Sequence, residues 1–271
     1  MNEIERKMVQ ILSRGKDEFG VVSVKAEFEA EGTRLEELLR LVDVARAAGL
    51  AITVKIGGCE AIRDLLEAKQ IGVQFIVAPM IESQYALSKF THAKNLIYSI
   101  DDQRDTEFLF NMETITSFNN REKLFDELIK HDGPNGIVFG RVDFVGSMGW
   151  PREAINLQKT TEYIVEIAKL CKNHNKHLVM GGGVSIESIE AIKKVHETRL
   201  DRFETRKVVF GAEIALQSDI EMGLLDAVEF ELLWLINKQN YYSGIAAEDS
   251  SRIQMLKLRH QELSEWKSRR S

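Results

Sequence analysis

The alternation of two hydrophobic periodicities constrains the fold of this chain more than any other feature. Short runs rich in β-branched and aromatic residues recur along the sequence, and most are nearly continuous in hydrophobicity, as in parallel strands covered by helices. Between most of the runs lie stretches with the apolar spacing of amphipathic helices, of which residues 33–48 are an example. The runs comprise residues 21–28, 50–56, 73–79, 95–100, 106–112, 136–140, 177–181 and 207–211.

This pattern predicts an α/β protein with the (β/α)8 architecture of a TIM barrel. An open, doubly wound sheet is the alternative, but it usually carries G-x-G-x-x-G after its first strand, and here that strand runs into EFEAEG. We expect a helix over residues 2–14 to cap the lower mouth of the barrel. Residues 212–238 and 248–269 are predicted to form further helices. We therefore assign residues 1–238 to the barrel domain and residues 239–271 to a helical extension.

Composition excludes several classes of protein. The 271 residues include 42 acidic and 36 basic side chains, for a net charge of -6, and no Lys/Arg-rich block is present, so nucleic acid is not the expected ligand. The sequence has no run of eighteen apolar residues and no apolar signal-peptide core, so we expect a cytoplasmic protein without a membrane partner. Its two cysteines are expected to be reduced thiols.

Charged residues gather where the predicted strands end, which is the active-site end of such barrels. A cluster of carboxylates there is costly without positive charge. Lys55 and Arg141 would supply that charge in a metal-free network, whereas a hard divalent cation such as Mg²⁺ or Mn²⁺ would bind the same oxygens. Both interpretations stay open on the residues alone. The acidic strand-end residues are Glu27, Glu29, Glu82, Glu113, Asp143 and Glu213.

Glycines adjoin two of these strand ends. Gly140, directly before Arg141, would let the backbone approach a ligand closely. Gly182 lies in the triplet 181–183, and Ser185 beyond it is a good helix N-cap, so backbone amides there would suit an anion. An ordinary turn explains both segments equally well. The six histidines have no metal-ligand spacing and are predicted to lie on the surface.

Three strand-end segments resemble those of the HpcH/HpaI aldolase and citrate lyase family. They are VKIGG with VAPMIES (54–58 and 77–83), LFNMET (109–114) and GIVFGRVDFVGSMG (136–149). Members of that family are metal-dependent barrels that act on pyruvate-derived or acyl-derived substrates. The resemblance implies that Glu113 and Asp143 bind the metal, and consecutive strands about 5 Å apart would allow both carboxylates to reach one ion.

The chain also departs from the family pattern. The family usually has arginine where Lys55 stands, and lysine keeps the charge but loses the planar fork. The aldolase branch carries a histidine after the first strand, where this chain offers only glutamates. The position of Arg141 is commonly occupied by proline or another non-basic residue.

The resulting functional hypothesis is a divalent-metal-dependent carbon–carbon lyase that cleaves a 2-oxo acid through an enolate. Lys55 would stabilise the enolate oxygen, and Glu27 or Glu29 would transfer the proton. The alternatives are a lyase or transferase acting on an acyl thioester or phosphorylated substrate, and a catalytically inactive binding subunit. We expect a homo-oligomer in which residues 248–269 contact another subunit. The expected substrate contacts are Arg141, Gly140, Glu82, Ser147 and Gly182.

Overall fold

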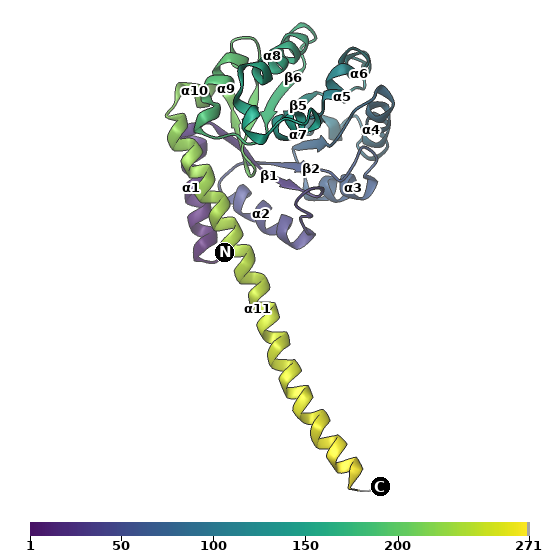
Figure 1. The fold of residues 1–271 in the computed structure, drawn as a ribbon, viewed down its shortest axis with the longest axis vertical. Helices are drawn as coiled ribbons and strands as arrows, with labels where there is room; N and C mark the ends of the chain where they lie inside the picture. Colours follow the sequence, from purple (N-terminus) through teal and green to yellow (C-terminus); the bar gives the residue numbers. More distant parts are fainter. Residues whose placement is uncertain (270–271) are drawn as a thin grey trace.

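Eight strands pair in chain order and close into a barrel, which confirms the predicted fold class (Figure 1). The computed structural model describes residues 1–269. Helices surround the strands, and extra helices lie at both ends of the chain. No helix in this described part is long and apolar enough to cross a membrane, while a cytoplasmic location stays a prediction.

The strands are β1 (Val21–Glu27), β2 (Ala51–Lys55), β3 (Phe75–Ala78), β4 (Glu107–Met112), β5 (Gly136–Gly140), β6 (His177–Gly181), β7 (Arg202–Glu204) and β8 (Val208–Gly211). The α-helices are α1 (Glu3–Phe19), α2 (Leu35–Ala47), α3 (Ile62–Ile71), α4 (Gln84–Ile97), α5 (Ile115–Asn119), α6 (Arg121–Leu128), α7 (Arg141–Ser147), α8 (Gln158–Asn173), α9 (Ile189–His196), α10 (Ala212–Gln217) and α11 (Ile220–Ser268). Short 3-10 turns are η1 (Asp102–Arg104), η2 (Arg152–Asn156) and η3 (Ile186–Ser188).

The strands divide their side chains between two cores, because successive residues of a strand point to opposite faces. Alternate residues such as Phe108, Phe110 and Phe139 join the large core that includes the surrounding helices. The intervening residues Val77, Leu109, Val138 and Val179 form a separate small cluster, which we call the aliphatic layer. Two residues before this layer, at the lower end of the barrel, β4 carries Glu107 and β6 carries His177. The charged side chains above the layer come mainly from β1, β2 and β7 (Lys25, Glu27, Lys55 and Glu204).

One predicted strand is wrong and one real strand was missed. Residues 95–100 include the end of α4, which buries Leu87, Phe90 and Lys94 at helical spacing and places Tyr98 directly after its last turn. The missing strand is β7, which has only three residues. Its charged ends, Arg202 and Glu204, hide it from a search for apolar runs.

The last strand also runs the other way. β8 pairs antiparallel with both β7 and β1, whereas β1 to β7 pair in parallel. The residues after β8 therefore lie at the lower end of the barrel. Glu213, predicted to stand at the active-site end, instead contacts His196 at 3.1 Å on the surface there. At the upper end of the barrel, the tight turn between β7 and β8 stands where Glu213 was expected.

The helix α1 lies beside the barrel and not across its lower mouth. It runs antiparallel to α11, with Lys7 against Glu229 (2.7 Å) and Arg14 against Asp226. Figure 1 shows the two helices side by side. The predicted helix over residues 2–14 thus exists as Glu3–Phe19 but belongs to the outer layer.

The two predicted C-terminal helices are one continuous helix. α11 has 49 residues, begins at Ile220 after the short α10, and projects far beyond the barrel (Figure 1). The division between barrel and extension at residues 238 and 239 falls within this helix and stays a prediction. Residues 270–271 of that extension lie outside the described residues.

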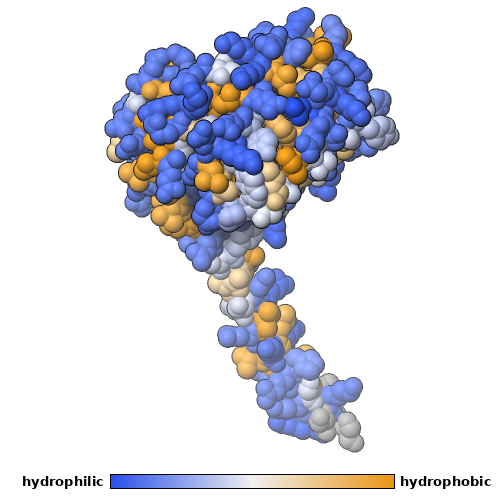
Figure 2. Space-filling view, turned by 45° about the horizontal axis from the view of Figure 1, so that its top comes forward, coloured by the Kyte–Doolittle hydropathy of each residue, from blue (hydrophilic) through white to orange (hydrophobic). Residues whose placement is uncertain are grey.

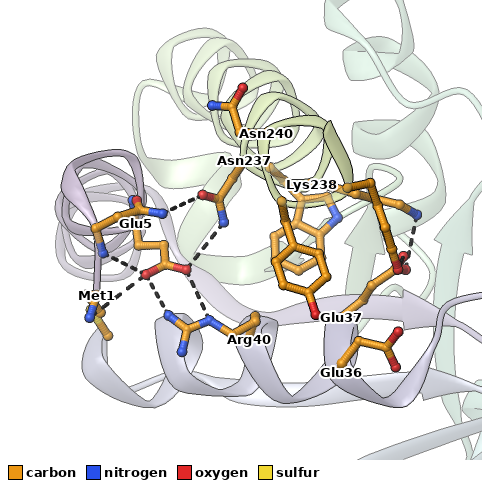
Figure 3. Close-up of a pocket in the computed structure, with 12 residues that line it drawn as sticks. Met1, Glu5, Glu36, Glu37, Arg40, Asn237, Lys238 and Asn240 are labelled. Carbon is orange, nitrogen blue, oxygen red and sulfur yellow. Dashed lines mark hydrogen bonds and ion pairs between the residues drawn. The ribbon is translucent and has the colours of Figure 1, made fainter. Parts of the chain in front are cut away.

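A cavity of about 540 Å³ marks the place where α11 leaves the barrel. Figure 3 shows its polar contacts: Arg40 and Asn237 bind Glu5, and Lys238 binds Glu37. Because both buried carboxylates are paired within the protein, these contacts anchor α11 to α1 and α2.

Candidate functional site

A cavity of about 520 Å³ opens at the carboxyl ends of β1 to β7, where active sites form in barrels of this kind. Side chains from the strand ends, the β7–β8 turn and α11 line it. Its six carboxylates outnumber its four cationic side chains, so the lining carries an excess of negative charge. The acids are Glu27, Glu29, Glu113, Asp143, Glu204 and Glu231, and the cations are Lys25, Lys55, Arg152 and Arg206.

Lys55 stands at the end of β2 between two carboxylates. Its Nζ lies 3.0 Å from Glu29 Oε2 and 3.4 Å from Glu113 Oε2. Burial lowers the pKa of Lys55, but the charges of Glu113 and Glu29 raise it by more, so the net pKa is raised. Lys55 is therefore a permanent ammonium group at neutral pH, buried to 6% exposure yet open to the cavity.

Glu113 is held in place from three sides. Met80 N–H donates to its Oε1 at 2.9 Å, and Asn111 Nδ2 donates to its Oε2, which also faces Lys55. Met80 has a φ of +49°, a conformation that costs energy for a residue with a side chain and is often found at functional sites. Gly140 provides the space, because a Cβ there would lie 2.9 Å from Glu113 Oε2.

Lys25, on the neighbouring strand β1, is a second buried lysine that forms an ion cluster with two carboxylates. Lys25 Nζ lies 2.5 Å from Glu204 and 3.0 Å from Glu27. Burial lowers the pKa of Lys25, but the two carboxylates raise it well above its usual value. In turn, burial raises the pKa of Glu27, and Lys25 lowers it by more, so Glu27 is an ionised carboxylate at the cavity wall.

Asp143 completes the acidic set from the first turn of α7. It is exposed and lines the cavity, and its side chain makes no hydrogen bond or ion pair with any described residue. Within residues 1–269, no three His, Cys, Asp or Glu side chains lie close enough together to hold a metal as they stand. The oxygens nonetheless fit a hard cation, since the buried Asn111 Oδ1 has no partner and adjoins Glu113.

Arg141 lies outside the cavity, contrary to the role expected for it. Its guanidinium group is fully buried and donates to Gly181 O (3.2 Å), Asn156 Oδ1 (3.0 Å) and Ser188 Oγ (3.1 Å). Burial lowers the pKa of Arg141 to about 10. The residue therefore acts as a clamp that fixes the glycine segment after β6, and it is not positioned to contact a substrate.

Of the other four predicted substrate contacts, two line the cavity and two do not. Gly140 and Gly182 line the cavity, and Gly182 needs its φ of +82° and its missing Cβ, which would lie 2.7 Å from Arg141 N. Glu82 accepts a hydrogen bond from Thr114 Oγ1, and Ser147 Oγ accepts one from Ile115 N–H. Neither of these two side chains lines the cavity, so both support loops around it.

Sequence reasoning missed several residues of the site. Lys25 lies two residues before Glu27, so the alternation of the strand would have placed both side chains on one face. Glu204 and Arg206 come from the β7–β8 hairpin, whose first strand has no apolar run to mark it in the sequence. Arg152 has an exposed side chain at the cavity rim, and it is the one lining cation without a carboxylate within salt-bridge distance among the described residues.

Solved structures share this fold at low sequence identity. An HpcH/HpaI aldolase from Desulfitobacterium hafniense matches with a TM-score of 0.59 and 12% identity, over 75% of this chain and 83% of that one. An HpcH/HpaI aldolase/citrate lyase family protein from Burkholderia cenocepacia gives 0.59 and 11%, over 84% and 89%. A variant of the citrate synthase SbnG gives 0.52 and 16%, over 73% and 81%.

These similarities confirm the barrel, and they agree with the family that the strand-end motifs resemble. No family model and no curated protein sequence matches the chain. The similarity therefore concerns the fold. The reaction has to be argued from the residues of the site.

Proposed function

We propose that this protein is a divalent-metal-dependent carbon–carbon lyase that cleaves a 2-oxo acid through an enolate. The observation that carries the proposal is the buried ammonium group of Lys55, 3.4 Å from Glu113 at the active-site end of the barrel. A fixed positive charge in a buried site is suited to the oxygen of an enolate, because that oxygen gains negative charge as the bond breaks. The excess of carboxylates around the cavity supports an added cation.

Glu113, Asp143 and Asn111 Oδ1 are the oxygens that would hold the metal. When bound, Mg²⁺ or Mn²⁺ supplies Lewis acidity at the oxygens of the substrate. Lys55 would release its contact with Glu113 and keep its contact with Glu29, which lies closer at 3.0 Å. The ammonium group would then face the keto oxygen.

The reaction balances with groups of this chain. In a 4-hydroxy-2-oxo acid, the 4-hydroxyl proton passes to Glu29 or Glu27, and the bond between C3 and C4 breaks to release an aldehyde. The electron pair of that bond forms the enolate, with Lys55 beside its oxygen. The same carboxyl group then returns the proton to C3 and yields pyruvate. Glu27 is suited to the initial base role because Lys25 keeps it ionised.

Arg152 takes over the substrate-binding role first given to Arg141. It stands at the rim with the glycine segment 181–183 and Val142, and no carboxylate of the described residues pairs with it. A guanidinium group free at a cavity rim can bind a carboxylate or phosphate on the part of the substrate that leaves. The proposal therefore favours a substrate with a second anionic group.

The test is pyruvate release by the purified full chain from a panel of 4-hydroxy-2-oxo acids, with and without Mg²⁺ or Mn²⁺. We expect metal-dependent release, fastest for substrates with a second anion. Calorimetric titration of the same metals into wild type and Asp143→Asn tests the metal ligands independently. Equal metal binding by both proteins, or turnover without metal, would contradict the proposal.

A second candidate reaction acts on an acyl thioester or a phosphorylated substrate. Arg152 beside the glycine segment favours it, since both features also suit phosphate. Cleavage of such a substrate, with no pyruvate from any hydroxy-oxo acid, would select this second reaction. Failure to bind metal together with no turnover of either class would indicate a binding subunit.

A further inference from the structure

The exposed side of α11 carries a regular apolar stripe over almost its whole length. Its positions alternate three and four residues apart, the spacing that faces a partner helix in a coiled coil, and polar residues interrupt it at Gln239, Asp249 and His260. The hydrophobic patches on the projecting part of the helix are visible in Figure 2. We call these positions the α11 stripe: Leu225, Val228, Leu232, Leu235, Gln239, Tyr242, Ala246, Asp249, Ile253, Leu256, His260 and Leu263.

The barrel leaves this stripe uncovered except at Tyr242, whose hydroxyl donates to Glu37 of α2 at 2.6 Å. On the part of α11 that packs on the barrel, Leu224 and Phe230 are buried against the core, while Leu225 and Leu232 on the other side are 56% and 55% exposed. On the projecting part, Ile253, Leu256 and Leu263 are all about half exposed. Exposed apolar positions at one spacing on both parts of the helix indicate a partner that spans both.

The stripe positions are arranged symmetrically in the sequence on either side of Gly244, so the stripe can pair with an antiparallel copy of itself. Leu225 and Leu263 each lie 19 residues from Gly244, Leu232 and Leu256 lie 12 away, and Leu235 and Ile253 lie 9 away. The polar position Gln239 is matched with Asp249, five residues on either side. Two antiparallel copies crossing at Gly244 would therefore place leucine against leucine or isoleucine, and amide against carboxylate. Small residues (Ser243, Gly244, Ala246 and Ala247) surround the crossing point.

The polar position Asp249 favours the same antiparallel orientation. A parallel pair would instead set Asp249 against Asp249 of the second copy, which is unfavourable for two carboxylates.

We propose that two copies of this chain associate through the α11 stripe, antiparallel and crossing near Gly244. Each projecting end then lies along the barrel part of the other copy's helix. Val228, which lines the cavity at the strand ends, is matched with His260 of the second copy, both 16 residues from Gly244. The second copy therefore forms part of the rim of the cavity. This proposal is independent of the reaction that the site performs.

The first test is the mass of the full chain in solution by light scattering. Wild type should have twice the 30.9 kDa of one chain, and Leu256→Glu or Leu232→Glu should halve the measured mass. Leu258→Glu is the matched control, because Leu258 is 64% exposed on the same helix but lies off the stripe. Circular dichroism verifies that each variant is folded. A monomeric wild type, or an unchanged mass for Leu256→Glu, would overturn the proposal.

The second test is the orientation, read from disulfide cross-links in a Cys59→Ser background, where the remaining Cys171 is buried. Leu232→Cys and Leu256→Cys chains should cross-link when mixed and not when each is alone. Cross-linking of each variant with itself would indicate a parallel pair and overturn the antiparallel register. No cross-link in the mixture would also overturn it.

Discussion

The barrel interior contains two charged layers, separated by the aliphatic layer, and the two differ in how completely their charges are paired. In the lower layer, Glu107 accepts from His177 (2.9 Å) and Arg202 (2.7 Å), and the Arg202 guanidinium group lies 4.3 Å from the Phe75 ring centroid. In the upper layer, Asp143 and Arg152 have no ionic partner among the described residues, and Asn111 Oδ1 is buried without a hydrogen bond.

The comparison separates two uses of buried charge. The lower layer has its hydrogen bonds and charges satisfied within the protein, so it contributes to stability. The upper layer keeps unpaired oxygens, an unpaired cation and a strained Met80 around an open cavity. Groups left without partners by the protein are available to a ligand, which is why the upper layer is the candidate site.

Asp143→Asn should have the largest effect on activity. If Asp143 binds the metal, its loss should lower kcat/KM by more than the roughly 100-fold typical of outer-shell metal partners. The free energy of unfolding without metal should not fall, because the substitution removes repulsion within an acidic cluster. Steady-state kinetics and urea unfolding of both proteins provide the measurement, and a destabilised Asp143→Asn would place this residue with the structural charges instead.

Lys55→Met should lower kcat by roughly 100-fold, the scale of losing one donor to a transition-state oxygen. Metal content, measured by mass spectrometry, should be retained because lysine is not a ligand. Lys55→Arg is the companion variant: full activity would show that charge alone is needed, and inactivity would show that the shape of the cation matters. Normal turnover by Lys55→Met would contradict the assigned role.

Arg152→Gln should raise KM about tenfold, equivalent to about 1.4 kcal/mol, for substrates with a second anionic group. Substrates without that group should show no change, because Arg152 contacts no reacting atom in the proposal. Arg63→Gln is the control, as Arg63 is 87% exposed and does not line the cavity. Equal effects on both substrate types would mean that Arg152 acts through the general charge of the rim.

Glu107→Gln should leave activity unchanged and lower the free energy of unfolding at pH 7 by about 1–3 kcal/mol. After the opposing effect of burial, His177 and Arg202 lower the pKa of Glu107 from 4.5 to about 2. A lowered folded-state pKa gives stability that is fully present above pH 4.5 and is lost as the pH falls to about 2.

The difference in unfolding free energy between wild type and Glu107→Gln should therefore shrink between pH 4.5 and 2, measured by denaturant unfolding at each pH. A constant difference across that range would show that the ionised form of Glu107 does not stabilise the lower layer. A loss of activity at pH 7, in turn, would break the distinction between the two layers.

The local sequence was sufficient to predict those features whose pattern lies within a single segment. The runs at 50–56 and 136–140 are strands because their continuous apolar character suits burial on both faces. Lys55, Glu113 and Asp143 meet at one cavity because parallel strands bring their carboxyl ends to one side of a barrel.

Arg141 and Arg152 show the limit of that reasoning. Both are arginines beyond the same strand, and nothing local separates them. Packing decides, because Arg141 finds four oxygen acceptors in three neighbouring segments and is enclosed, while Arg152 stands at the rim of the cavity.

What the sequence determined by itself is therefore the class of fold and most of the strand ends that face the site, because both depend on a short-range period. The three-dimensional structure decided the reversal of β8, the hairpin that brings Glu204 and Arg206 to the cavity, and the pairing of each buried charge. These depend on contacts between residues distant in the chain, such as Lys25 with Glu204, which no local pattern encodes.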